Sequence, residues 1–579
     1  MKTLTRLVLS VSVLGCPGVA WGQSAETPAA TPAATAEEPE TTSQGVEEII
    51  VTAQRREQRL QDVPIAVSVL SAGTLAASGI GTTDALLAVT PGLVATRQLK
   101  GSTPYIRGLG TQSTAPGVES PVAQYVDGVY YTSPAGNIFS FNNIERVEVL
   151  KGPQGTLFGR NTTGGLIHVV TRDPSPDPAV EGSVNYGNYD TLEAAIYATG
   201  GGDAIAADIA GYFIDNSGFG RNLTVGGQVN ELHEIALRSK ILFRPGANTR
   251  VTLSGDYLRN DSDIGATRNI VAGSLGLGAT PMRGTIYDTQ SGFLPETSTD
   301  YWGVSLKAEQ EAGNFRFQSI TAYRDIDSLN HFDQDAVPLN AANVTARETV
   351  ETFQQEVLAI GRIGRLDLTT GLFYFHANAK YDPLGVQSIA PGSNTATFPT
   401  QILDSYAAFA DGTLALTDST NLTAGIRYTI DDRHFEAVTL ATAGNPRPVG
   451  TVLVSQPRVN ATFRKFTYRV VLDHKLAPDV MIYASYNTGF KAGVFNPTVI
   501  TQPVLLPENV RALEGQVNWP EWSRDIPYLP FNLKLLSSDQ DAGQGPTQFQ
   551  NLNLPAWLVE QVGLLGVVHG HVGAAVAQG

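Results

Sequence analysis

The sequence predicts a mainly β protein, a transmembrane antiparallel β-barrel that follows an N-terminal domain of mixed α and β structure. Charged residues make up only 16% of the 579 residues, whereas soluble domains have roughly 25%. No apolar run reaches the ~18 residues of a membrane-spanning helix, although 42% of the chain is hydrophobic. From about residue 180 onward, apolar and polar residues alternate with a period of two. Since lipid admits only helices and closed barrels, a membrane protein with this sequence must be a barrel.

Residues 1–22 have the pattern of a cleaved secretory signal peptide. Two basic residues precede an apolar run and a small-x-small cleavage site. Cys16 is the only cysteine and lies in the part expected to be removed, so the mature chain would have no disulfide and no thiol ligand. The alternative is lipoprotein processing at Cys16, which Leu14 disfavours because a small residue is usual at that position.

Two short segments separate the signal peptide from the first domain. Residues 23–45 are rich in Ala, Pro, Thr and Glu, and we expect a disordered leader there. Residues 46–54 form a β-branched run flanked by charge, with no helical period. We expect an unpaired strand in which Ile49 and Val51 share one face. The alternative is an edge strand of the domain that follows.

Residues 60–174 have a mixed α and β pattern and predict a compact domain. We expect strands at 63–70, 105–107, 124–126, 144–150 and 166–171, a short helix at 72–78, and a second helix that starts near Thr82–Asp84 and ends at Pro91-Gly92. Glycines separate the later strands, where close backbone approach and tight turns are expected.

Residues 175–515 predict the strands of a partial barrel. Segments of about ten residues lie at 181–188, 191–199, 207–215, 233–243, 250–258, 301–310, 314–324, 352–361, 366–377, 405–416, 421–430, 466–474 and 480–490. Short connections such as Pro245–Asn248 alternate with long ones, which we expect at 259–300 and 377–401. Short turns at one end and long loops at the other are typical of outer-membrane barrels.

Several phrases of the sequence identify a family. EEIIVTAQ is followed by PGL, YIRGLG, VDGVYY and IERVEVLKGPQGTLFGRNTTGGLIHVVTRDP, in that order. Residues 46–174 thereby resemble the N-terminal part of TonB-dependent outer-membrane receptors, and PENVRALEG continues the resemblance into the barrel. The resemblance implies that residues 46–54 are a TonB box and that residues 60–174 are a plug inside the barrel.

The resemblance also implies a function. A receptor of this kind imports a scarce ligand, most often an iron-siderophore complex, across the outer membrane of a Gram-negative cell. Its partners would be the ligand, outer-membrane lipid, and TonB with its inner-membrane energising complex. It would need no cofactor and would catalyse no covalent reaction.

Two sets of site residues follow from the resemblance. By strand addition, TonB would contact Glu47, Glu48, Ile49, Ile50, Val51, Thr52 and Ala53. The plug motif residues are Arg107, Gly108, Asp127, Gly128, Glu145, Arg146, Glu148, Lys151, Gly152, Gly155, Gly159, Arg160, Gly164 and Gly165. We expect Arg107, Glu145, Arg146, Glu148 and Lys151 to pair with the inner barrel wall, the alternative being ordinary plug surface. Ligand contacts are expected at Gly110–Glu119 and in the long loops by position alone.

Other function classes find little support in the sequence. A net charge of −16 argues against a nucleic-acid partner. The histidines are scattered, no HExxH motif is present, and the glycines after Lys151 do not form a P-loop. A secreted β-rich enzyme or adhesin is therefore a weaker alternative, and a passive porin would need neither a box nor a plug.

The barrel pattern is shorter than the family requires. Importers of this family have about 22 strands, whereas we find about 13 segments before residue 505 and one more at 511–517. Residues 516–579 contain several Trp and Pro residues and no terminal strand ending in an aromatic residue. We expect an atypical tail, produced by a frame change or fusion near Gly515. The alternatives are a smaller or co-assembled barrel, and a truncated receptor that forms no functional barrel.

Overall fold

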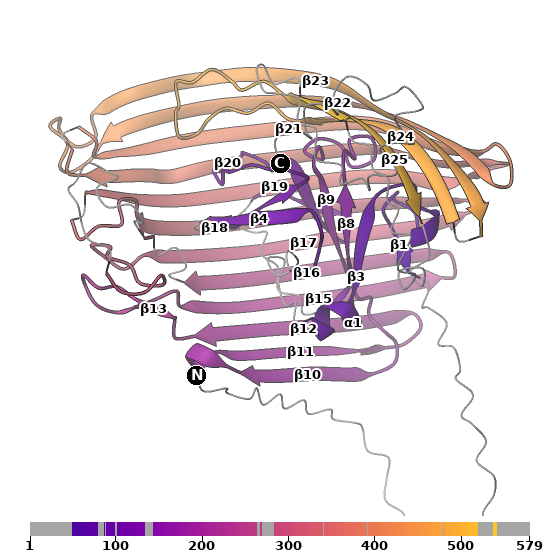
Figure 1. Cartoon of the computed structure of the whole chain (residues 1–579), viewed down its shortest axis with the longest axis horizontal. Coiled ribbons are helices and arrows are strands. Elements are labelled where there is room, and N and C mark those ends of the chain that lie inside the picture. Colours follow the sequence, from indigo (N-terminus) through magenta and orange to yellow (C-terminus); the bar gives the residue numbers. More distant parts are fainter. Residues whose placement is uncertain are drawn as a thin grey trace, which may run out of the picture.

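The computed structural model describes residues 49–518 and 537–540, apart from 79–85, 87–88, 99–100, 134–142, 263–266, 269–282, 340, 391 and 479. The signal peptide, the leader, Glu47, Glu48, the start of the second helix and most of the tail lie outside the described residues. The described chain has two parts (Figure 1). We call residues 49–174 the inner domain and the 15-stranded sheet that follows the large sheet. This confirms a mainly β fold with an N-terminal α+β domain.

The inner domain is built around a five-stranded sheet with the order β3-β8-β9-β6-β7. Its elements are β1 (Ile50–Val51), β2 (Gln58–Arg59), η1 (Leu60–Asp62), β3 (Val67–Ser71), α1 (Ala72–Ala77), β4 (Leu93–Gln98), β5 (Gly101–Ile106), β6 (Val122–Val126), β7 (Val129–Tyr131), β8 (Ile144–Lys151) and β9 (Gly165–Thr171). The pairs β1-β2 and β4-β5 form separate hairpins. The helix expected at 72–78 and the strands expected at 124–126, 144–150 and 166–171 are confirmed.

Two expected strand boundaries in the inner domain are wrong. The strand expected from residue 63 begins only at Val67, because Pro64 has no N–H to donate to a neighbouring strand. Arg107 lies outside β5 in a turn, where it has a φ of 54° and Gly108 a φ of 80°. The expected strand at 105–107 therefore ends one residue earlier, at Ile106.

The strands of the large sheet pair antiparallel with their sequence neighbours. They are β10 (Ala179–Tyr186), β11 (Leu192–Gly201), β12 (Ile205–Asn216), β15 (Leu232–Gly246), β16 (Thr249–Ser262), β17 (Glu296–Ala312), β18 (Phe315–Asp333), β19 (Ala342–Ile363), β20 (Leu366–Ser388), β21 (Thr395–Ala415), β22 (Thr420–Ala441), β23 (Val452–Ala477), β24 (Val480–Lys491), β25 (Glu508–Asn518) and β26 (Ser537–Gln540). A small hairpin of β13 (Gly220–Arg221) and β14 (Gln228–Val229) lies between β12 and β15. The order is open, from β10 at one edge to β26 at the other.

Each expected barrel segment, including the one at 511–517, coincides with a strand of the large sheet. The expected long loop at 377–401 is wrong, because β20 continues to Ser388 and β21 begins at Thr395. Strands were also expected to have about ten residues, the length that spans a bilayer, but β23 has 26. Near the C-terminal end of β20 the outward positions Asn378 and Lys380 are polar, whereas Ala379 and Tyr381 are buried on the inner face, so the exposed apolar stripe ends before the strand does.

The two faces of the large sheet have opposite character. On the outer face, apolar side chains such as Trp302, Phe317 and Leu372 are 43%, 47% and 63% exposed. On the inner face, Lys240, Arg324 and other charged side chains are buried against the inner domain. A soluble protein shows the reverse arrangement, and an apolar outer face with a polar inner face is typical of a membrane β-barrel. Among the described residues, no helix is long and apolar enough to cross a membrane.

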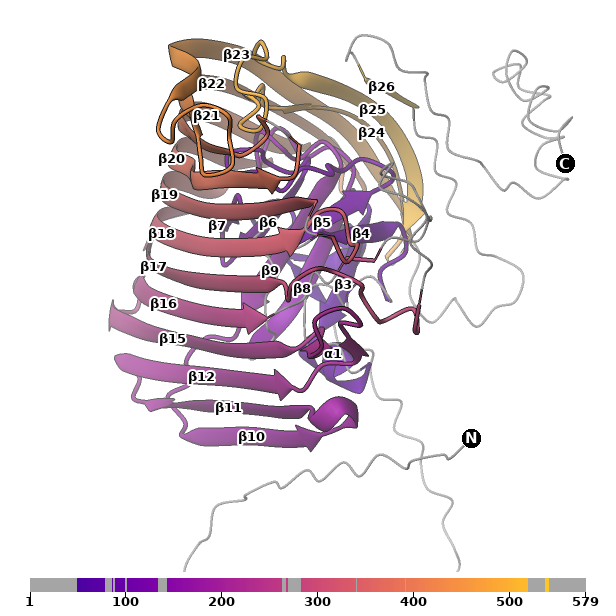
Figure 2. The same ribbon diagram turned by 90° about the vertical axis from the view of Figure 1, so that its left-hand side faces the viewer.

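The connections define two ends of the large sheet. Tight turns join β15 to β16, β17 to β18, β19 to β20, β21 to β22, and β23 to β24, and we call this end the short-turn end. The other end, where the longer connections lie, is the long-loop end. Figure 2 shows the sheet curving around the inner domain. The apolar core of the inner domain continues into the inner face of the sheet, since Val126 and Val129 share a cluster with Ile320.

Candidate functional site

The segment expected to be an unpaired strand is paired in this structure. Ile50 and Val51 pair with Arg59 and Gln58 of β2. The chain reverses at Arg55, which has a φ of 60° and donates its backbone N–H to the Thr52 carbonyl. The expectation was wrong because this reversal supplies the segment with a partner from its own chain. The expected common face of Ile49 and Val51 is confirmed, since both pack on one apolar cluster while Ile50 is exposed.

Glu148 of β8 ties this segment to the inner domain. Its Oε1 accepts hydrogen bonds from the Thr52 backbone N–H at 2.9 Å and from Arg146 Nε at 2.8 Å. The Thr52 hydroxyl also donates to this carboxylate, and His168 Nδ1 lies 3.6 Å from its Oε2. Burial opposes ionisation of the carboxyl, but His168 and Arg146 outweigh burial and lower the pKa of Glu148 to about 2. We call Thr52, Arg146, Glu148 and His168 the latch.

The substitution Glu148→Gln is expected to loosen the segment around Thr52. Hydrogen bonds to a charged group are worth roughly 1.5–3 kcal/mol, so exchange of the Thr52 amide should accelerate about 10- to 100-fold, as measured by hydrogen exchange on the peptide that contains it. Glu181→Gln, at an exposed glutamate of β10 that pairs with Arg172 outside the latch, is the control and should leave the exchange unchanged. Equal protection in the two variants would contradict the assignment of the latch.

The latch also has a defined pH dependence. The pKa of Glu148 lies at about 2 in the folded protein, below the ordinary glutamate value of 4.5. Its stabilising contribution is therefore complete above the ordinary value and is lost as pH falls through about 2.

The turn that follows Thr52 is also held to the large sheet. Arg55 pairs with Glu356 at 3.2 Å and Arg56 with Asp367 at 3.5 Å.

A second buried cluster lies nearer the long-loop end. Glu119 accepts hydrogen bonds from Arg160, from Arg433 of β22 at 2.9 Å and from the Tyr130 hydroxyl at 3.2 Å. Burial opposes ionisation of Glu119, but the two guanidinium groups outweigh burial and hold the pKa of this carboxyl below its usual value. The cluster joins the inner domain to the large sheet by paired charges that are removed from water.

The expectation of pairing with the inner wall is confirmed for one of the five charged residues. Arg107 pairs with Glu514 of β25 at 3.2 Å. The expectation is wrong for Glu145, Arg146 and Glu148, because Arg146 reaches both carboxylates of its own strand. Lys151 donates its backbone N–H to the Ala66 carbonyl, and burial lowers the pKa of its ammonium group.

The glycines of the plug motif allow close approach of two chains. A Cβ at Gly155 would lie 2.6 Å from the Thr488 carbonyl oxygen of β24, so this position sets the contact between the inner domain and the large sheet. Gly165 has a φ of 140°, and a Cβ there would lie 2.1 Å from the Leu150 carbonyl oxygen of the neighbouring strand. The remaining glycines of the motif lie at turns or close contacts, namely Gly108, Gly128, Gly152, Gly159 and Gly164.

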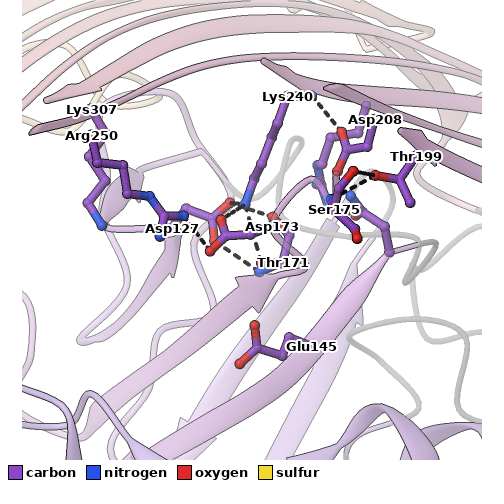
Figure 3. Close-up of polar contacts among 12 residues, drawn as sticks. Asp127, Glu145, Thr171, Asp173, Ser175, Thr199, Asp208, Lys240, Arg250 and Lys307 are labelled. Carbon is purple, nitrogen blue, oxygen red and sulfur yellow. Dashed lines mark hydrogen bonds and ion pairs between the residues drawn. The ribbon is translucent and has the colours of Figure 1, made fainter. Parts of the chain in front are cut away.

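Asp127 lies in the β6–β7 turn and connects the inner domain to β15 (Figure 3). It accepts hydrogen bonds from the Thr171 backbone N–H at 2.9 Å and from the Thr171 hydroxyl at 2.6 Å, and Lys240 Nζ lies 3.2 Å from its Oδ2. Burial opposes ionisation, but Lys240 and Thr171 outweigh it and lower the pKa of Asp127 to about 2. Asp173 extends the network, since it pairs with both Lys240 and Arg250.

A cavity of about 1450 Å³ lies beside this network, between the inner domain and strands β15–β18 at the short-turn end. Asp127, Lys240 and Arg250 line it on one side. Ile49, Ile50, Thr52 and Arg55 line it on another, together with the latch residues Arg146 and His168. The segment expected to contact TonB is therefore part of the cavity wall.

The segment expected to contact ligand by position lies near the long-loop end. Ala115 and Val118 are buried in an apolar cluster with Ala346, Tyr381 and Val494 of the large sheet and its connections. Ligand contact by Gly110–Glu119 remains a prediction. Within the described residues, no group of three or more His, Cys, Asp or Glu side chains is placed to hold a metal ion.

Comparison with family models identifies both parts of the chain. The model for the TonB-dependent receptor plug domain matches residues 59–166. The model for the TonB-dependent receptor-like β-barrel matches residues 237–533, slightly more than half of the chain.

Curated proteins show the same relationship at lower coverage. The chain is 34% identical over 152 residues to the pesticin receptor of Yersinia pestis, covering 25% of this chain and 22% of that protein. It is 24% identical over 440 residues to the rhizobactin receptor of Rhizobium meliloti, covering 68% of this chain and 57% of that protein. The chain thus spans less than two thirds of the length of these relatives.

Solved structures share the fold. The ferric yersiniabactin uptake receptor of Yersinia pestis superimposes with a TM-score of 0.67 at 19% identity, covering 79% of this chain and 70% of that one. The siderophore receptor PiuA of Acinetobacter baumannii superimposes with a TM-score of 0.63 at 18% identity, covering 83% and 72%. At these identities the likeness concerns the fold alone.

Proposed function

Because the chain belongs to the TonB-dependent receptor family, we propose that it imports a ferric siderophore across a Gram-negative outer membrane with energy supplied through TonB. In this proposal residues 1–22 are the signal peptide, 23–45 the leader, 46–54 the TonB box, 60–174 the plug, 175–515 the strands of the barrel, and 516–579 an atypical tail. The segment of residues 47–53 contacts TonB, and the apolar outer face of the large sheet contacts lipid.

The observation that carries the proposal is the position of the inner domain inside the large sheet. Buried ion pairs hold the inner domain against several different strands of the large sheet. They are Arg55 with Glu356, Glu119 with Arg433, and Arg107 with Glu514. An inner domain fixed in this way obstructs passive diffusion through the barrel. Transport therefore requires work to move the inner domain. The siderophore class is supported by the names of the relatives, among them the rhizobactin receptor and the ferric yersiniabactin uptake receptor.

Uptake of radioactive iron tests the proposal. Cells that lack their own siderophore receptors would express the chain and receive a panel of ferric siderophores that includes yersiniabactin, rhizobactin and a catecholate. We expect one ferric siderophore to bind at the cell surface and to accumulate only when the proton-motive force and TonB are intact. If no member of the panel binds, the siderophore class is wrong.

A second candidate is a receptor that does not form a functional barrel. It is favoured by the open order of the large sheet, in which β10 pairs only with β11 among the described residues. It predicts that the expressed protein shows no heat-modifiable migration on gels and that the cells accumulate no iron from the ferric siderophore. Heat-modifiable migration together with TonB-dependent accumulation would exclude it.

A further inference from the structure

The cavity at the short-turn end has a floor made of matched rows of side chains. Ser254 of β16 pairs with Ser305 of β17, and both line the cavity. The row nearer the short-turn end contains Thr252, Lys307 and Ile320, which also line it. Small hydroxyl side chains at the inner edge of this floor leave the space open, and a volume of about 1450 Å³ exceeds the roughly 300–1,000 Å³ of ordinary ligand sites.

The next row closes the cavity towards the long-loop end. It contains Asp256, Gly303 and Arg324 on three adjacent strands. Arg324 pairs with Asp256 at 3.0 Å and lies over Gly303, where a Cβ would be 2.7 Å from its Nη1. From the inner domain, Tyr131 meets this row, with its ring centroid 3.9 Å from the Arg324 guanidinium carbon and its hydroxyl 2.7 Å from that of Tyr301. We call Tyr131, Asp256, Tyr301 and Arg324 the closing row.

The other wall of the cavity is formed by the segment on which TonB would pull in the proposed function. Ile49, Ile50 and Thr52 line the cavity and are attached to the inner domain through the latch. Displacement of this segment towards the short-turn end removes part of the wall. The cavity already reaches the β15–β16 turn at Gly246–Asn248, so a force applied there would widen its opening at the short-turn end, while the closing row still separates it from the long-loop end.

The lining of the cavity mixes polar and apolar side chains, and its charges nearly balance. Lys240 and Arg250 are paired with Asp127 and Asp173 (Figure 3). Lys307 is paired with Glu309 at 3.0 Å. Paired charges of this kind create little net field, so they do not retain a strongly charged solute. They suit a polar ligand of low net charge that must enter and leave again.

We propose that this cavity is a second binding site for the transported chelate, occupied after the chelate passes the closing row and before it is released at the short-turn end. This proposal rests on the proposed function. It assigns the route to one side of the inner domain, between that domain and β15–β18, and it assigns the site a polar, weakly charged metal chelate as ligand.

Filling the cavity tests the proposal. The double variant Ser254→Trp/Ser305→Trp places two indoles on the floor of the cavity. We expect the rate of iron accumulation from the ferric siderophore that the unaltered chain imports to fall at least about tenfold, because two indoles next to the closing row obstruct the entrance to the cavity from that row. Surface binding of the same ferric siderophore, measured on de-energised cells, should change less than about twofold since the cavity lies at the opposite end.

The matched control lies one residue away on the same two strands. Leu253 pairs with Leu306, and both side chains point to the outer face, where they are 49% and 44% exposed. The variant Leu253→Trp/Leu306→Trp should import at the rate of the unaltered chain. Unchanged import by the serine variant would overturn the second site, whereas an unaltered chain that imports nothing would overturn the proposed function instead.

A labelling experiment covers the case in which the filled variant does not assemble. Ser254→Cys would be introduced with Cys16→Ser, so that the new thiol is the only one in the chain. A bulky maleimide added after assembly should block import when it reacts at position 254 and leave import intact when it reacts at Leu253→Cys. Full import by the chain labelled at position 254 would overturn the proposal.

Discussion

Deletion of residues 47–54 is expected to abolish energy-dependent import of the ferric siderophore and to leave its binding at the cell surface within about twofold of the unaltered chain. The deletion removes the strand to which a TonB strand would add, and it removes Thr52 from the latch. The contacts of Glu119 and Arg107 with the large sheet remain, so the inner domain stays in place. Iron accumulation and surface binding would be measured on the same cells.

The control deletes eight residues from the expected leader, residues 30–37, which shortens the chain equally. We expect normal import from this variant, because the proposed function assigns contact with TonB to residues 47–53 and only a linking role to the leader. Import that survives loss of 47–54 would exclude energy coupling through this segment. Loss of surface binding as well would indicate that the deletion disrupts the inner domain rather than its coupling.

The substitution Glu119→Ala is expected to destabilise the contact between the inner domain and the large sheet by roughly 3–5 kcal/mol. It leaves the buried guanidinium groups of Arg160 and Arg433 without their shared carboxylate. The two adjacent cations repel each other, and Asp431, whose Oδ1 lies 3.9 Å from Arg160 Nε, offsets part of this repulsion. The change would be measured as urea-dependent loss of protease protection of the inner domain in detergent.

An exposed ion pair provides the control for this prediction. Glu181 of β10 pairs with Arg172 at 2.8 Å, but its side chain is 58% exposed. Glu181→Ala should cost no more than about 1 kcal/mol, because water replaces the lost partner. An equal cost for both substitutions would contradict the importance assigned to burial.

The contribution of Glu119 to stability also depends on pH. The pKa of Glu119 is lowered, so this contribution is present above the ordinary glutamate pKa and is lost as pH falls through the pKa of the folded protein.

The strands of the large sheet could be predicted from the sequence because apolar side chains alternate with polar ones along them and are exposed on the outer face. In β18, alternation between Phe317 and its inward neighbours is visible without knowledge of any partner. The ends of the strands could not be predicted in this way. Beyond the exposed apolar stripe, residues 377–388 stay in the strand because they pair with β19. The sequence of one strand does not reveal how long its neighbouring strand is.

The contacts of the inner domain were less accessible to sequence reasoning. Arg107 was expected to meet the inner wall, but its partner Glu514 was not identified, and Lys240 and Arg433 were missed as site residues. Glu119 was expected only as the end of a segment that contacts ligand, and its ion pairs were not predicted. Glu119 and Arg433 are 314 positions apart, and they meet only when the register of the large sheet has been set. A buried Arg or Lys at an inward position of an alternating strand is the signal that could have marked them.

The long sequence separations across this interface determine the order in which the protein can be assembled. Asn518 donates a hydrogen bond to the Val63 carbonyl across 455 positions, and Lys475 pairs with Asp62 at 2.7 Å. A contact between such distant residues loses loop-closure entropy before it gains any stabilising energy, so these contacts form late in folding. The first part of the domain to leave the ribosome must therefore wait for β23–β25 before its final partners exist, and during that interval its charged residues are exposed to water.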